Sequence, residues 1–160
     1  MLIRTFGFFD VSRLAASYTL INSKERVESD DPLHTRVWRT PLDAAREKPW
    51  RAAEAFLTKL RGEASALFNG IPPVITNAVV RSISPGGRID WHQDKGEGVQ
   101  VHVCLVPSPG AWLYCGGEGV VLGWGHVTAI ERAAWHSEIN FGPVTMSKLV
   151  LDMALPDVDA

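Results

Sequence analysis

The spacing of apolar residues separates a helical stretch in the first half of the chain from a run of short strands in the second. Between Pro49 and Asn69 the apolar positions recur every three or four residues, which is typical of an amphipathic helix with one buried face. That face consists of Trp50, Ala53, Leu57, Leu60, Ala64 and Leu67. Asn69 and Gly70, followed by two prolines, predict the end of this helix.

Two further features precede the helix. Residues 21–35 are mostly polar and charged, and they predict a loop or a flexible flap. One hypothesis is that this flap is a lid that becomes ordered when substrate binds. Thr40 and Pro41 predict a helix start, with Thr40 as the N-cap and Pro41 at the first helical position.

From residue 74 onwards the segments are short, rich in Val and Ile, and separated by Gly or Pro, as strands are. The predicted strands are Val74–Ile83, Val99–Val106, Gly119–Leu122, His126–Ile130, His136–Phe141 and Thr145–Met153. Three Gly- or Pro-rich segments predict turns: SPGG at 84–87, PSPG at 107–110 and CGGEG at 115–119. Helices followed by strands favour an α+β, mainly β fold, in which a small sandwich or barrel is flanked by helices.

Composition limits the number of domains and the class of protein, but it indicates no particular reaction. A length of 160 residues fits a single domain (1–160), with residues 1–73 as helical and loop support and 74–155 as the β core. A hydrophobic fraction of 46% and a charged fraction of 21% permit a sizeable core. The net charge of −2 gives no pointer to a nucleic-acid partner, although it leaves a local basic patch open. Without a spanning apolar run or a signal-peptide pattern, and with only two cysteines, we expect a cytoplasmic protein that is not inserted in a membrane.

Candidate chemistry is concentrated around His92 and Asp94. On an extended segment residues i and i+2 point the same way, so the imidazole and the carboxylate converge. His136, 44 residues beyond His92, is a candidate third ligand. Two histidines and one carboxylate on one face of a metal form the facial triad of non-heme Fe(II) oxygenases, which leaves positions open for a bidentate 2-oxo acid and O₂. The alternatives are a partly buried structural histidine at 92 and a turn-capping carboxylate at 94.

An ordered set of motifs over roughly residues 76–153 resembles the aspartyl/asparaginyl β-hydroxylase family, which comprises Fe(II)- and 2-oxoglutarate-dependent dioxygenases with a double-stranded β-helix (jelly-roll, cupin-like) core. The set begins with Pro85-Gly86-Gly87, followed by Ile89 and His92, and continues with a strand that carries His102 and ends in Leu105-Val106-Pro107. Next come Gly117-Glu118 and Trp124-Gly125, and then His136-Ser-Glu-Ile-Asn140. The last motif is an apolar strand with Leu149, Leu151 and Asp152. The resemblance implies this fold and the cofactors Fe(II), 2-oxoglutarate and O₂.

Residue by residue, the resemblance implies that His92 and His136 bind iron and that His102 helps to hold a 2-oxoglutarate carboxylate. Asp94 would complete the triad, and an acid at this position argues against halogenation. The strand of His102 supports this interpretation independently, because Gln100, His102 and Cys104 form its more polar face, as suits a cavity lining. The alternative for His102 is a satisfied core histidine.

The sequence departs from the family where the far carboxylate of 2-oxoglutarate needs a cationic partner. The family usually has an arginine about ten residues after the second iron histidine, and Met146 stands there. Lys148 and Arg81 are the candidate replacements, since a buried carboxylate needs a charged or hydrogen-bonded partner. For each of them the alternative is a solvated or ion-paired surface residue. Trp91, Gln100 and Asn140 are candidates for a substrate pocket.

We therefore expect a dioxygenase that hydroxylates an unactivated C–H bond, by resemblance the β-carbon of an Asp- or Asn-like substrate. That substrate is either a free amino acid or a residue in a peptide or protein. One rival is a cupin-like metalloprotein, an isomerase or hydrolase, that does not use a 2-oxo acid. The presence of Met146 in place of the arginine leaves this interpretation open. The other is a non-catalytic binding module, against which the complete set of candidate ligands argues.

Overall fold

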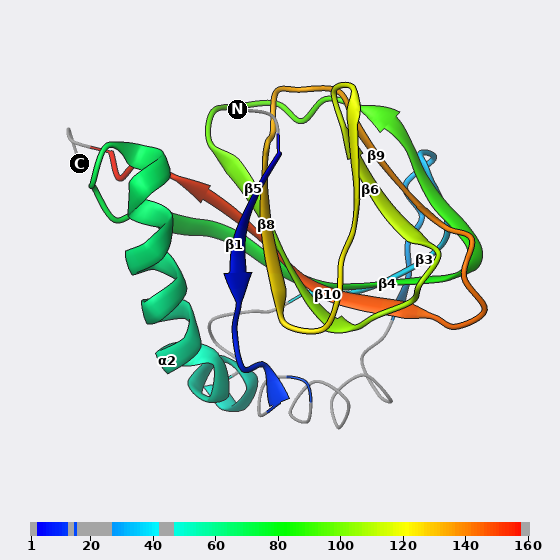
Figure 1. Cartoon of the computed structure of the whole chain (residues 1–160), viewed down its shortest axis with the longest axis horizontal. Coiled ribbons are helices and arrows are strands. Elements are labelled where there is room, and N and C mark those ends of the chain that lie inside the picture. Colours follow the sequence, from blue (N-terminus) through cyan, green and yellow to red (C-terminus); the bar gives the residue numbers. More distant parts are fainter. Residues whose placement is uncertain (1–2, 13–14, 16–26, 42–46, 158–160) are drawn as a thin grey trace.

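The computed structural model describes residues 3–12, 15, 27–41 and 47–157. Strands dominate these residues, and one long helix accompanies them (Figure 1). In chain order the elements are β1 (Ile3–Phe8), β2 (Val27–Glu28), β3 (His34–Pro41), α2 (Glu47–Ala64), the short 3-10 helix η1 (Ser65–Phe68), β4 (Val74–His92), β5 (Val99–Val106), β6 (Ala111–Cys115), β7 (Glu118–Val121), β8 (His126–Glu131), β9 (His136–Asn140) and β10 (Met146–Ala154).

The strands form one antiparallel sheet that folds over on itself as a jelly-roll double-stranded β-helix. Its order is β1-β8-β5-β10-β4-β9-β6-β7, and β3 pairs with β4 and β2. The long strand β4 belongs to both halves, because its first part pairs with β10 and its last part, residues 88–92, pairs with β9 (Figure 1). The two halves face each other, so inward side chains from β4, β5, β9 and β10 meet between them.

The bend that joins the two halves lies in the SPGG segment. We predicted a turn there, but β4 continues through it as a bent strand. Gly86 has a φ of 77°, and a side chain on Gly87 would collide with the backbone oxygens of Ser84 and Arg36. Opposite the bend, Arg36 of β3 also has a positive φ, at a shift in the β3–β4 register. Both strands therefore change direction together.

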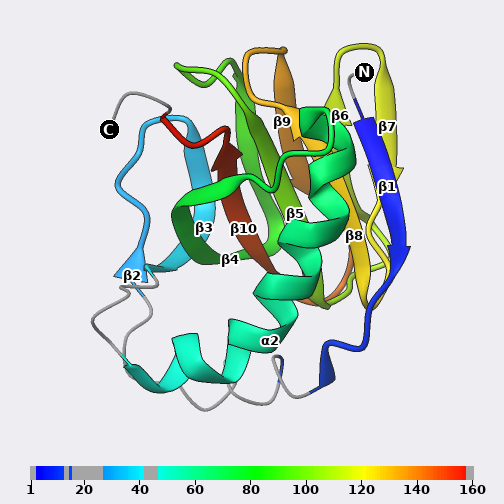
Figure 2. The same ribbon diagram turned by 90° about the vertical axis from the view of Figure 1, so that its left-hand side faces the viewer.

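The main apolar core lies between α2 and the outer face of β5, β8 and β10 (Figure 2). As the helical spacing predicts, Leu57, Leu60 and Ala64 are buried in this cluster, and Leu67 is partly buried against it. The helical segment ends at Asn69, which adopts the left-handed conformation, as Asn and Gly do at helix ends. Within the described residues, the structure holds no helix that is both long and apolar enough to span a bilayer.

The strand predictions for the second half are largely confirmed. β5 has the predicted bounds, and β7, β8, β9 and β10 lie within one residue of them. PSPG and CGGEG connect β5 to β6 and β6 to β7, as predicted. β6 was not predicted, because its AWLYC sequence is short and lies between two of the predicted turns.

The prediction for the first half is wrong in two respects. Thr40 and Pro41 do not begin a helix, because they end β3, where pairing with Val80 and Val79 of β4 overrides the local helix-start signal. β1 and β3 add strands to a region that we expected to be only helix and loop. Of the proposed flap, residues 21–26 lie outside the described residues, and residues 27–28 and 34–35 belong to β2 and β3.

We predict that Leu60→Ala lowers the free energy of unfolding by about 2–5 kcal/mol, because it removes a fully buried side chain between α2 and the sheet. Denaturant unfolding followed by circular dichroism measures this change. The control is Leu155→Ala at an exposed site, for which we expect a change of about 0.5 kcal/mol or less. Equal effects of the two substitutions would contradict the proposed core.

Candidate metal centre

His92 and His136 are brought together by strand pairing. They lie directly opposite each other in the antiparallel pair of β4 and β9, and such residues project from the same face of the sheet. Their rings are 4.2 Å apart between centroids and tilted by 58°. Two residues 44 positions apart in sequence are thus fixed as neighbours by backbone register alone.

Each ring is oriented by a backbone carbonyl from its own chain segment. The Nδ1 atom of His92 lies 2.7 Å from the oxygen of Asp90, and that of His136 lies 2.8 Å from the oxygen of Ala134. A carbonyl only accepts, so Nδ1 carries the proton and donates it in both residues. The Nε2 lone pairs are then free to bind a metal, which is the arrangement that supports metal-binding histidines.

Asp94 faces both Nε2 atoms from the segment after β4. Its carboxylate oxygens lie 3.6 Å from Nε2 of His92 and 3.5 Å from Nε2 of His136. Its backbone N–H donates to the oxygen of Arg132, and Gln100 Nε2 donates to Oδ2 at 3.3 Å. Burial raises the pKa of Asp94, but the neighbouring His136, His92 and Arg132 outweigh it, and the net pKa lies below its usual value, so the carboxylate is charged and can bind a metal.

The three side chains of the predicted triad thus converge on one point. Ligand atoms of His92, Asp94 and His136 lie within 4.8 Å of one another, a spacing that one metal ion can bridge. His136 is buried, whereas the other two are partly exposed and face a cavity. Imidazole nitrogens and a carboxylate suit Fe(II), and their position on one side leaves the cavity side open for other ligands.

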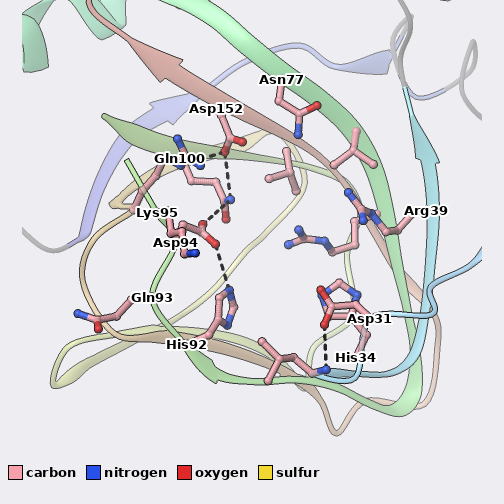
Figure 3. A pocket seen from close by; sticks show the side chains of 15 residues that line it. Asp31, His34, Arg39, Asn77, His92, Gln93, Asp94, Lys95, Gln100 and Asp152 are labelled. Carbon is pink, nitrogen blue, oxygen red and sulfur yellow. Dashed lines mark hydrogen bonds and ion pairs between the residues drawn. The ribbon is translucent and has the colours of Figure 1, made fainter. Parts of the chain in front are cut away.

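The cavity beside the triad measures about 370 Å³, within the range of small-molecule sites. Charged and polar side chains dominate its wall (Figure 3). They are contributed by Asp31, His34, Arg39, Asn77, Arg81, His92, Gln93, Asp94, Lys95, Gln100, Arg132 and Asp152. Gln100 is therefore placed in the cavity, where it also donates to Asp152 at 3.2 Å.

The three residues predicted to hold a 2-oxoglutarate carboxylate gather around an acid that we had not singled out. Glu138, buried on β9, accepts a hydrogen bond of 2.7 Å from Nη1 of Arg81 and contacts the ammonium of Lys148. His102 places Nδ1 3.7 Å from the same carboxylate. Strand alternation supplies the missed signal, because Glu138 lies two residues after His136 and shares its inward face.

Burial depresses the basicity of the groups around Glu138. Burial and then the charges of Lys148 and Arg81 hold the pKa of His102 well below its usual value, so His102 is neutral. Burial, followed by the charge of Arg81, also lowers the pKa of Lys148. His102 and Lys148 are fully buried and lie behind the cavity wall, whereas Arg81 is part of it.

Two candidates for the substrate pocket lie elsewhere. Trp91 is half exposed on the outer face of the sheet, against Tyr114, because it alternates with the inward His92. Asn140 is buried and bonded to the oxygens of Ile83 and Val144, so it secures the turn after β9. Met146 packs in a small apolar cluster with Val37, Ile83, Ile89 and Ala111.

His34, which sequence reasoning missed, lines the cavity at the start of β3. Its Nδ1 lies 2.7 Å from Oγ of Ser29, and its Nε2 lies 3.8 Å from the Asp31 carboxylate. Burial and the positive charge of Arg81 lower its pKa to about 4, against the opposing effect of Asp31. His34 therefore stays neutral at physiological pH.

The comparisons with known proteins agree with this architecture. The chain matches no protein-family model and no curated protein sequence. It is similar in structure to AviO1 from Streptomyces viridochromogenes Tue57, with a TM-score of 0.75, 19% identity, and coverage of 98% of this chain and 90% of that one. It is also similar to the viral collagen prolyl hydroxylase vCPH from Paramecium Bursaria Chlorella virus-1, solved as a 2OG complex, with a TM-score of 0.76, 10% identity and coverage of 98% and 97%.

A third similar structure is the epimerase SnoN in complex with Fe3+, alpha ketoglutarate and nogalamycin RO. Its TM-score is 0.72 at 14% identity, with coverage of 92% of this chain and 76% of that one. At such identities these likenesses establish the fold, the jelly-roll double-stranded β-helix that the sequence predicts. The chemistry of this chain has to be argued from its own residues.

We predict that His136→Ala weakens binding of a divalent metal by more than about a hundredfold, since loss even of a residue that supports a ligand costs about 10–100-fold. Isothermal titration with Co(II) measures the change. The matched control is His126→Ala on β8, whose Nδ1 accepts a bond from the Gly123 N–H. Equal metal affinity in the two variants would rule out the proposed centre.

We predict a pH dependence of stability that arises from His34. Its native pKa of about 4 lies below the usual 6.5, so the unfolded chain binds a proton first as pH falls. Stability supplied by neutral His34 is therefore present above pH 6.5 and declines by up to about 3 kcal/mol towards pH 4. Urea unfolding of wild type and His34→Gln at several pH values measures this, and parallel pH profiles would contradict it.

Proposed function

We propose that this chain is an Fe(II)- and 2-oxoglutarate-dependent oxygenase that hydroxylates an unactivated C–H bond. The convergence of His92, Asp94 and His136 at the edge of a polar cavity carries this proposal. The donor set, two imidazoles and one carboxylate, is that of non-heme Fe(II) oxygenases. The fold supports it, because similar structures include a prolyl hydroxylase solved with 2OG and an epimerase solved with Fe3+ and alpha ketoglutarate.

Within this proposal, Nε2 of His92, Nε2 of His136 and the Asp94 carboxylate would hold Fe(II). Bound Fe(II), with a 2-oxo acid and O₂, supplies the oxidising power for C–H hydroxylation. The carbonyls of Asp90 and Ala134 keep the proton on Nδ1 of each ring, so both Nε2 atoms stay available as ligands. Gln100 orients the carboxylate of Asp94 by donating to Oδ2.

The cavity wall also supports a small, charged substrate. Acidic side chains (Asp31, Asp94 and Asp152) and basic side chains (Arg39, Arg81, Lys95 and Arg132) line it together. A wall with both signs of charge suits a ligand that carries an ammonium and carboxylates. We therefore propose an Asp- or Asn-like substrate, free or within a peptide, hydroxylated at its β-carbon. The family resemblance of the motifs around His92 and His136 supports this finer assignment.

One specific observation favours a second candidate. Met146 stands where the family has its arginine, and Glu138 already occupies Lys148 and one nitrogen of Arg81. A cupin-like metalloprotein, an isomerase or hydrolase that uses no 2-oxo acid, needs no such arginine. Metal binding alone fits both candidates, so the use of a 2-oxo acid separates them. The third possibility, a non-catalytic binding module, would bind neither the metal nor the 2-oxo acid.

We predict that wild-type protein, titrated anaerobically with Fe(II) and 2-oxoglutarate, develops the weak visible charge-transfer absorbance of a chelated 2-oxo acid. His136→Ala should not develop it, because one iron ligand is lost, and His126→Ala should behave as wild type. On admission of O₂, wild type should convert 2-oxoglutarate to succinate and CO₂. Iron binding without the absorbance band would instead favour the metalloprotein.

A further inference from the structure

Strand register places three cations in one row behind the candidate metal centre. Arg81 of β4 pairs directly with Arg39 of β3 on one side and with Lys148 of β10 on the other. Directly opposed residues project from the same face, with their Cβ atoms about 5 Å apart. Two residues further along the same strands, Val37, Ile83 and Met146 form the next inward row, which is apolar.

Such a row is unfavourable unless anions accompany it, because like charges repel and buried charges need partners. Glu138 reaches it from β9 and takes up part of the positive charge. Its carboxylate contacts the Lys148 ammonium and accepts from Nη1 of Arg81 at 2.7 Å. Lys148 is fully buried and its ammonium contacts Glu138, so it is not available to a ligand in the cavity.

The remaining positive charge faces the cavity. Arg39 and Arg81 both line it, and the Nε atom of each is buried without a hydrogen-bond partner among the described residues. The acids nearby have partners of their own: Asp31 with His34, Asp94 with the two histidines, and Asp152 with Arg132 and Gln100. A guanidinium group whose buried Nε–H has no acceptor favours an anionic ligand such as a carboxylate.

We propose that Glu138 is a built-in counter-ion for Lys148, and that Arg39 together with Arg81 forms the site that binds the far carboxylate of the 2-oxo acid. The proposal rests on the proposed function, since it names where that cosubstrate is anchored. Glu138 lies two residues beyond His136 on β9, about 7 Å along the strand. A short dicarboxylic acid bound at the metal spans that distance. Arg39 is thus a specificity-determining residue, contributed by a strand outside the predicted β core.

The experiment measures binding instead of turnover. Protein loaded with Zn(II), which does not change oxidation state, is titrated calorimetrically with 2-oxoglutarate and with 2-oxopentanoate, in which a methyl group replaces the far carboxylate. The ratio of the two dissociation constants isolates the contribution of that carboxylate. In wild type we expect 2-oxoglutarate to bind roughly ten- to a hundredfold more tightly, as charge-assisted hydrogen bonds provide.

Arg39→Gln should reduce this ratio to near one without changing the affinity for Zn(II). The control Arg61→Gln also removes an arginine, but on α2, where Arg61 donates to the Pro73 carbonyl, and it should keep the wild-type ratio. Removal of one partner of a buried ion pair often unfolds a protein, so Lys148 is tested in the double variant Glu138→Gln/Lys148→Met. This variant should keep the ratio or increase it, because Arg81 is released from Glu138.

A ratio that falls to near one in the double variant and persists in Arg39→Gln would assign the carboxylate to Lys148 and overturn this inference alone. If wild-type Zn(II) protein binds neither 2-oxo acid, the proposed function fails as well, and the two failures are therefore distinguishable. Loss of the ratio in Arg39→Gln, with retention in both other variants, supports the site.

Discussion

The antiparallel pairing of β4 with β9 is the constraint on which the candidate site depends. It sets His92 opposite His136, and the carbonyls of Asp90 and Ala134 then hold both rings in one tautomer. A shift of the register by one residue would turn one histidine to the outer face, where Trp91 lies. The bend of β4 at Gly86 and Gly87 matters for the same reason, since it carries the strand from β10 to β9.

Charge compensation is the second organising feature of the interior. The row of Arg39, Arg81 and Lys148 would be costly in an apolar jelly roll, and Glu138 partners only Lys148 and Arg81 directly. Met146 packs among apolar side chains, so the buried positive charge of these strands lies in the neighbouring row of Arg39, Arg81 and Lys148.

Local sequence signals performed well where burial and propensity agree. Leu57, Leu60 and Ala64 form the buried face that their spacing predicts, and the Val-rich segment at 99–106 is β5. The local signals failed where pairing between strands overrides them. Thr40 and Pro41 look like a helix start, yet β4 offers them a strand partner, and SPGG looks like a turn although neighbouring strands keep it extended through the bend. Glu138 was missed because its partners come from three other strands.

The fold class and the amphipathic helix follow from the sequence, because helical spacing and strand alternation are local patterns. The sequence also marked His92, Asp94 and His136 as candidate ligands, but cross-strand register is what brings His136 to the other two. Which charges face one another depends on the tertiary structure. Cross-strand register places Arg39 beside Arg81, closes Lys148 behind Glu138, and directs Trp91 and Asn140 away from the cavity. Such pairings join residues many positions apart, and burial makes them energetically decisive, so no single segment of the chain encodes them.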